Sequence, residues 1–92
     1  MLVKTEVVNK VTAKEAYKII KKKYPDKVVV ECLEFNNFYA FALADKGTEN
    51  EPFGGGYDTV DKNTGKIDVF SPMEDFEAFF TAKKIKIIEF NN

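Results

Sequence analysis

Apolar residues recur at helical spacing near the start of the chain. The pattern follows Thr12 and Glu15, which are spaced as a capping box, with the Thr hydroxyl and the Glu carboxylate each accepting from the other's backbone amide. Pro25 then interrupts it, because proline cannot continue a helix. The spacing predicts a helix over residues 13–24. Its apolar positions are Ala13, Ala16, Tyr17, Ile20 and Tyr24.

Two runs rich in β-branched and aromatic residues follow, at 28–35 and 38–45. Asn36-Asn37 between them predicts a hairpin in which Phe35 opposes Phe38. Strict alternation from that register predicts a core face made of Val28, Val30, Cys32, Tyr39, Phe41 and Leu43. The opposite face carries Val29, Glu31, Leu33, Phe35, Phe38, Ala40, Ala42 and Ala44. Because this face is also largely apolar, we expect either close cover by another element or contact with a partner.

Residues 57–70 predict a second hairpin, with Asn63-Thr64-Gly65 as a turn closed by a left-handed Gly. The pattern leaves two registers open. A four-residue loop pairs Val60 with Ile67. A three-residue loop instead places four residues on one face, namely Tyr57, Thr59, Ile67 and Val69.

The last third of the chain predicts a second helix and a final strand. Residues 71–74, Ser-Pro-Met-Glu, form another capping-box pattern with Pro at the first helical position. We expect a helix over 72–82, with an apolar stripe of Met73, Phe76, Phe79 and Phe80. In the tail that follows, Ile85 and Ile87 alternate with polar residues as in a strand.

Together these elements predict one α+β domain over residues 1–92, in the order α-β-β-β-β-α-(β). A mostly antiparallel sheet of four or five strands is expected to pack against one or two helices. Residues 1–10 are either a loose N-terminal segment or an extra strand.

Composition narrows the classes of function. The chain of 92 residues is 45% hydrophobic and 32% charged, as in soluble globular proteins. No apolar run approaches the roughly 18 residues of a membrane span. All fourteen basic residues are Lys and the net charge is −1. Guanine recognition favours Arg and nucleic-acid binding favours basic chains, so a nucleic acid is not expected as a partner. A membrane is not expected either, because the chain has no long apolar run.

Candidate catalytic chemistry is sparse. The chain has no His and a single Cys, so neither a metal site nor a cofactor is expected. Cys32 lies in an apolar run and is interpreted as a buried hydrophobe. Gly54-Gly55-Gly56 lacks the Lys-Ser or Lys-Thr of a phosphate loop. We predict no catalytic residues and a protein that is not an enzyme.

Two groups of residues are candidates for binding a partner protein. Aromatic side chains at turns or loops act as interface anchors when they are exposed. Lysines along one stripe of the first helix either form a solvated face or dock to an acidic surface. The candidate residues are Leu33, Phe35, Phe38, Phe53 and Tyr57 in the first group, and Lys14, Lys18 and Lys22 in the second.

A resemblance rests on Val60-Asp61-Lys62, Thr64-Gly65-Lys66 and Ser71-Pro72. This pattern is similar to small proteins of Gram-positive bacteria, their phages and prophages. More distantly it resembles small immunity proteins and PepSY-type inhibitory domains. The resemblance implies a non-enzymatic factor that binds or inhibits another protein. It also implies a cytoplasmic location in a bacterium or a phage-infected host cell, with a virion as the alternative.

Three hypotheses for function follow, in order of preference. The first is a protein-interaction module that binds an unidentified protein, as an immunity or phage-encoded factor would. The second is a structural protein that self-assembles through its sheet edges, as a homodimer or as a virion component. The third is an enzyme or small-ligand binder that uses carboxylates and Tyr.

Overall fold

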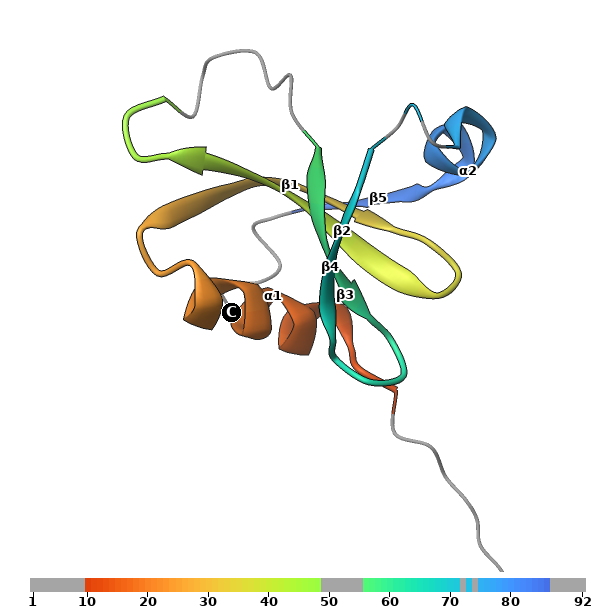
Figure 1. The fold of residues 1–92 in the computed structure, drawn as a ribbon, viewed down its shortest axis with the longest axis horizontal. Coiled ribbons are helices and arrows are strands. Elements are labelled where there is room, and N and C mark those ends of the chain that lie inside the picture. Colours follow the sequence, from red (N-terminus) through yellow and green to blue (C-terminus); the bar gives the residue numbers. More distant parts are fainter. Residues whose placement is uncertain (1–9, 49–55, 72, 74, 87–92) are drawn as a thin grey trace, which may run out of the picture.

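The computed structural model describes residues 10–48, 56–71, 73 and 75–86. The α+β class and the order of elements are confirmed (Figure 1). The elements are α1 (Ala13–Lys23), β1 (Lys27–Glu34), β2 (Phe38–Asp45), β3 (Tyr57–Asp61), β4 (Ile67–Phe70), α2 (Phe76–Thr81) and β5 (Lys83–Ile85). The strands form one sheet in the order β4-β3-β2-β1-β5, with every neighbouring pair antiparallel.

The predicted capping box begins α1. The Glu15 amide donates to Thr12 Oγ1 over 3.2 Å, and the Thr12 amide donates to Glu15 Oε1 over 2.9 Å. These bonds satisfy two amides that a helix start otherwise leaves without a partner. The helix ends where the Tyr24 amide donates to the Ile20 carbonyl over 2.9 Å. The prediction for this helix is therefore confirmed to within one residue.

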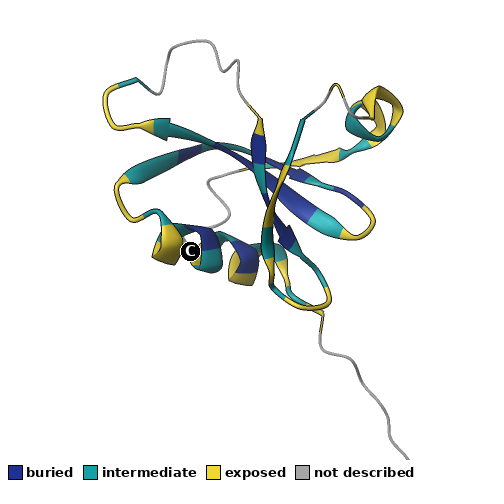
Figure 2. Cartoon of the chain, viewed as in Figure 1, coloured by how far each residue is buried: buried dark blue, intermediate teal, exposed yellow. Residues whose placement is uncertain are grey.

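α1 packs on one face of the sheet, which we call the helix face. Ala16 and Ile20 are completely buried against it. The buried residues of this face, α1 included, are Ala16, Ile20, Val29, Cys32, Tyr39, Phe41 and Val60. Figure 2 shows buried residues on α1 and in the three central strands. This cluster is the main core of the molecule.

The register of β1 and β2 follows the prediction near the turn and departs from it further along. The Phe35 amide donates to the Phe38 carbonyl over 2.9 Å, as expected for a two-residue connection. A β-bulge between Val29 and Glu31 then inserts one extra residue. Because a bulge reverses the side-chain alternation, Val29 lies on the helix face and Val30 packs on the opposite face. The predicted placement of these two valines was wrong.

The β3–β4 hairpin adopts the four-residue-loop register, in which Val60 pairs with Ile67. Asp61 Oδ1 accepts from the amides of Asn63 and Thr64 over 2.7 and 2.9 Å, which folds the turn locally. Gly65 has φ +76°, the left-handed conformation predicted for it. The four-residue alternative is thus confirmed and the three-residue one is wrong.

α2 is shorter than predicted and begins later. Its N-cap is Asp75, whose Oδ1 accepts from the Ala78 amide over 3.0 Å. Asp75 has φ −157°, so no helix runs continuously from position 72. The expected start at 72 was wrong because Asp75 caps the helix instead. Pro72 and Glu74, on which the predicted box depended, lie outside the described residues.

Candidate functional site

The face of the sheet opposite α1 carries a second apolar cluster and is called the aromatic face. Its buried residues are Leu33, Phe35, Ala40, Ala42 and Tyr57. α2 covers part of this face through Ala78 and Phe79. The ring of Phe79 lies 5.9 Å from the ring of Tyr57, centroid to centroid. The sequence predicted that this apolar face is either covered closely by another element or in contact with a partner. In the structure α2 covers part of it, and Phe70 of β4 packs against the same cluster.

The outer side of α2 presents aromatic rings to solvent. Phe76 is 54% exposed and Phe80 is 76% exposed. Their rings stack with centroids 6.1 Å apart, and Phe80 also contacts Phe79 at 5.7 Å. Met73, just before the helix, is 80% exposed. We call Met73, Phe76 and Phe80 the α2 ridge, which is the exposed apolar feature of this side of the molecule.

Phe38 belongs to an aromatic cluster on the same face. Its ring stacks on Phe35 at 4.5 Å and lies 5.7 Å from Phe70. Phe35 and Phe70 are 5.0 Å apart, so the three rings form one continuous group. Phe35 is buried, whereas Phe38 and Phe70 remain half-buried. The cluster therefore has a closed inner side and an open outer side.

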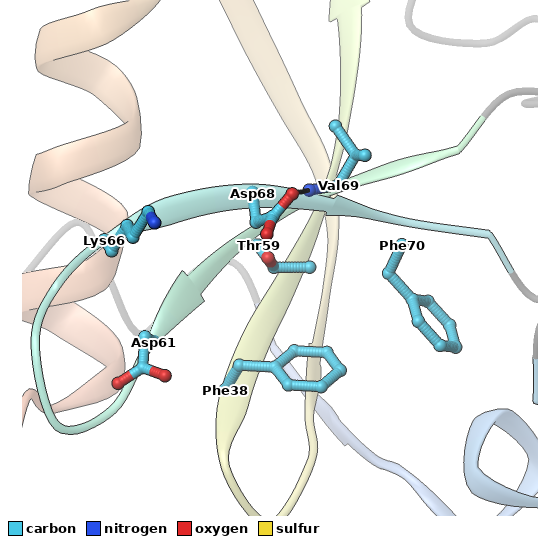
Figure 3. Close-up of a pocket in the computed structure, with 7 residues that line it drawn as sticks. All are labelled: Phe38, Thr59, Asp61, Lys66, Asp68, Val69 and Phe70. Atoms are coloured by element: carbon cyan, nitrogen blue, oxygen red, sulfur yellow. Dashed lines mark hydrogen bonds between the residues drawn. The ribbon is translucent and has the colours of Figure 1, made fainter.

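Two hollows flank Phe38. The first, the strand pocket, has a volume of about 210 Å³ and lies over β3 and β4 (Figure 3). It is lined by Phe38, Thr59, Asp61, Lys66, Asp68, Val69 and Phe70. Figure 3 shows that the Val69 side chain projects away from the two phenylalanine rings. Val69 thus belongs to the helix face, in keeping with strand alternation.

The second hollow, the turn groove, separates the β1–β2 turn from α2 and has a volume of about 250 Å³. It is lined by Glu34, Phe35, Asn36, Asn37, Phe38, Asp75, Ala78, Thr81 and Ala82. Because Phe38 lines both hollows, the strand pocket, the turn groove and the α2 ridge follow one another across one side of the molecule. Together they are the candidate site.

Carboxylates dominate the rim of this site. Asp61 and Asp68 line the strand pocket, and Asp75 lines the turn groove. The amides of Asn63 and Thr64 hold the pKa of Asp61 below its ordinary value, so the group is ionised at neutral pH. Glu34, which also lines the turn groove, differs from these three carboxylates because Lys62 forms an ion pair with it at 2.8 Å. Lys66 is the one basic side chain among those lining the two hollows.

A polar contact anchors the floor beneath α2. The Tyr57 hydroxyl donates to Glu31 Oε1 over 2.7 Å, and Lys84 of β5 lies 3.3 Å from Glu31 Oε2. Burial raises the pKa of Tyr57, and the bond to Glu31 raises it further. This contact joins β1, β3 and β5 and holds Tyr57 against Phe79.

The structure separates the predicted partner-binding residues. Leu33, Phe35 and Tyr57 are 6%, 8% and 5% exposed, so of the two alternatives left open for this face, close cover applies to these three side chains. Phe70 of β4 packs on the same face, and α2, in the connection from β4 to β5, adds further cover. Phe38 retains an open side and lines both hollows. Phe53 lies outside the described residues.

Lys14, Lys18 and Lys22 are exposed on α1. Since α1 packs on the helix face, these lysines lie in a different layer from Phe38. The two predicted groups therefore do not form one surface. Binding of a partner through either group stays a prediction.

Sequence reasoning missed the α2 ridge. The residues at 73, 76, 79 and 80 were interpreted as one apolar stripe of the second helix, but of these only Phe79 packs against the sheet. A signal was present, because adjacent residues such as Phe79 and Phe80 point about 100° apart around a helix. A short helix on an already filled face cannot bury both rings.

Groups with catalytic potential lie elsewhere. Cys32 is buried on the helix face, and burial together with Glu34 and Glu31 raises its pKa to about 12. The thiol is therefore protonated at neutral pH. Burial also raises the pKa of Asp58, which pairs with Phe41 and so faces away from the two hollows. Within the described ranges, no group of three His, Cys, Asp or Glu side chains is placed to hold a metal ion.

Comparison of the chain with family models, with curated proteins and with solved structures gives no match. In the part of the chain that the structure describes, no helix is both long and apolar enough to span a membrane. The resemblance to phage-type and immunity proteins stays a prediction.

Proposed function

We propose that this chain is a non-enzymatic protein-interaction module that binds another protein through the candidate site on its aromatic face. The exposed Phe76–Phe80 pair carries the proposal. Exposure of these two stacked rings to water is unfavourable, and their burial against a partner surface would stabilise the complex. Exposed aromatic residues beside hollows are typical anchors of protein interfaces.

The hollows beside the α2 ridge support the same function. An interface needs shape complementarity as well as apolar area. The strand pocket and the turn groove supply concave surface on both sides of Phe38. The resemblance adds a finer proposal, in which the partner is a protein that this chain neutralises or inhibits inside a bacterial cell.

Self-assembly through sheet edges, the second hypothesis, receives less support. The Val69 amide of edge strand β4 donates to Asp68 Oδ1 over 2.8 Å, and this carboxylate stands where an added strand would bond. The other edge strand, β5, is only three residues long and carries exposed Lys83 and Lys84. Short, charged edges disfavour pairing with another strand.

The test is affinity capture from lysate of the source organism with three tagged baits: the wild type, Phe80→Asp and Val69→Asp. Val69 borders the strand pocket, but its side chain is 70% exposed and projects to the helix face, so its variant makes a matched change on the face opposite the α2 ridge. We expect one stoichiometric partner with the wild type and Val69→Asp, and its loss with Phe80→Asp. Capture that survives Phe80→Asp would contradict the proposal.

Two variants from the predicted set sharpen the test. Phe38→Asp is expected to keep the fold and lose the partner, because one side of this ring is open. Phe35→Asp is expected to unfold the chain, because it places a charge in a site only 8% exposed. Circular dichroism of both variants checks these outcomes. Sedimentation of the wild type and of Phe80→Asp separates the hypotheses, since a dimer that persists in Phe80→Asp would favour self-assembly through the sheet edges.

A further inference from the structure

The strand pocket combines aromatic walls with negative charge. Phe38 and Phe70 form its apolar side, with ring centroids 5.7 Å apart and planes inclined by 48°. Figure 3 shows these rings toward one end of the pocket, and Asp61 and Lys66 toward the other. Asp68 lies between them on β4. The hollow is therefore amphipathic, with rings at one end and charges along the rest.

Neither carboxylate of the strand pocket, Asp61 or Asp68, forms an ion pair with a described residue. The hydrogen bonds that they accept come from backbone amides and, for Asp61, also from the Thr64 side chain, all of which are neutral donors. Lys66, the one cation that lines the pocket, is exposed. Two carboxylates against one ammonium group leave the lining with net negative charge.

We propose that the strand pocket binds an arginine side chain of the partner protein, an inference that rests on the proposed interaction function. A guanidinium group is flat and weakly hydrated, so it stacks on aromatic rings while it donates to carboxylates. Both kinds of group line this pocket. An ammonium group is more compact and more strongly hydrated, so lysine gains less from the rings.

These 92 residues cannot supply this ligand. All fourteen of their basic residues are lysines, and they contain no arginine. An arginine in the pocket therefore comes from outside this sequence, and a second copy of it would not provide one. The inference thus favours a heterologous partner over a second copy of this chain.

The probe is N-acetyl-arginine methylamide, titrated into the ¹⁵N-labelled full chain and followed by NMR. The neutral isostere, N-acetyl-citrulline methylamide, is the control ligand. We expect saturable shifts of the amides of Thr59, Asp61 and Asp68, with the arginine probe bound at least fivefold more tightly than the isostere. Equal binding of both ligands, or no saturable shift at these amides, would overturn the inference.

Variants that change the charge of the strand pocket test whether its negative charge strengthens binding of the arginine probe. Asp68→Asn keeps an acceptor for the Val69 amide and removes one negative charge, so it should weaken binding at least threefold. Lys66→Gln removes the competing cation and should strengthen binding at least twofold. Asp26→Asn, in the exposed turn after α1, makes the same charge change away from the pocket and should leave binding unaltered. Equal effects of Asp26→Asn and Asp68→Asn would show a general charge effect and overturn the inference.

The result of the arginine titration can be distinguished from the result of the affinity capture. If Phe80→Asp loses the partner and the arginine probe does not bind, the interaction function stands and the arginine site is wrong. If the probe binds and Phe80→Asp retains the partner, the pocket is a cation site and the α2 ridge is not the interface.

Discussion

The two faces of the sheet are covered by helices of different length, and this difference separates core from candidate site. α1 has eleven residues, about three turns, and buries Ala16 and Ile20 completely. α2 has six residues, and none of them is fully buried. A helix of fewer than two turns depends on tertiary contacts for its stability. The helix face therefore has completely buried side chains beneath α1, while the aromatic face keeps exposed rings with two hollows beside them.

The largest expected effect contrasts a ring on each face. Phe41 is fully buried on the helix face, so Phe41→Ala should lower the free energy of unfolding by about 3–5 kcal/mol. Phe80 is 76% exposed, so Phe80→Ala should change it by no more than about 0.5 kcal/mol. Urea denaturation of both variants measures the difference. Similar losses would show that the α2 ridge is part of the core.

The stability of the chain at alkaline pH tests one buried titratable side chain on each face of the sheet, the Cys32 thiol and the Tyr57 hydroxyl. The folded chain raises the pKa of Cys32 from its ordinary 9.0 to about 12, and also raises that of Tyr57. The unfolded chain releases these protons near the ordinary values, so stability is complete below pH 9 and falls as the pH rises. Each group contributes a slope of up to about 1.4 kcal/mol per pH unit between its two pKa values.

Variants assign this slope to the two faces. Cys32→Ala should remove the loss that begins near pH 9, and Tyr57→Phe part of the loss that begins near pH 10, because burial also raises the pKa of Tyr39. Denaturation midpoints measured from pH 7 to 11 give both slopes. An unchanged slope in Cys32→Ala would mean that the thiol ionises in the folded state as readily as in the unfolded state.

Most of the fold followed from local sequence, because its signals are short-range. The capping box at Thr12 and the left-handed Gly65 act within a few residues, and both predictions are confirmed. The bulge was hidden because three successive valines, 28–30, offer no contrast between faces. Alternation cannot locate an extra residue in a run of identical side chains.

The candidate site was less predictable because it depends on long-range packing. The sequence left open whether the aromatic residues at turns are covered or exposed, and in the structure Phe35 is buried and Phe38 is half-buried. Phe70 of β4 and α2 both contribute to their burial, and α2 reaches this face only because the chain connects β4 at one edge of the sheet to β5 at the other. No local pattern encodes that connection, so helix geometry indicates that Phe79 and Phe80 cannot share one face but not which of them meets the sheet.

The smallest expected effects compare the caps of the two helices. Thr12→Ala should lower the free energy of unfolding by about 1 kcal/mol, because α1 carries part of the main core. Asp75→Ala removes the acceptor for the Ala78 amide, but α2 buries little, so the loss should stay local. Urea denaturation should then show a much smaller change for Asp75→Ala than for Thr12→Ala.

Hydrogen exchange distinguishes local from global loss. In Asp75→Ala the Phe79 amide, which donates to the Asp75 carbonyl over 3.1 Å, should exchange about fivefold faster, since a lost cap costs about 1 kcal/mol. Amides of β1 and β2 should keep their protection. If those strand amides also exchanged faster, α2 would unfold together with the sheet. The α2 ridge would then be a rigid part of the domain. If only α2 opens, its exposed rings lie on the least stable element of the fold, and a partner that orders α2 would stabilise it by binding.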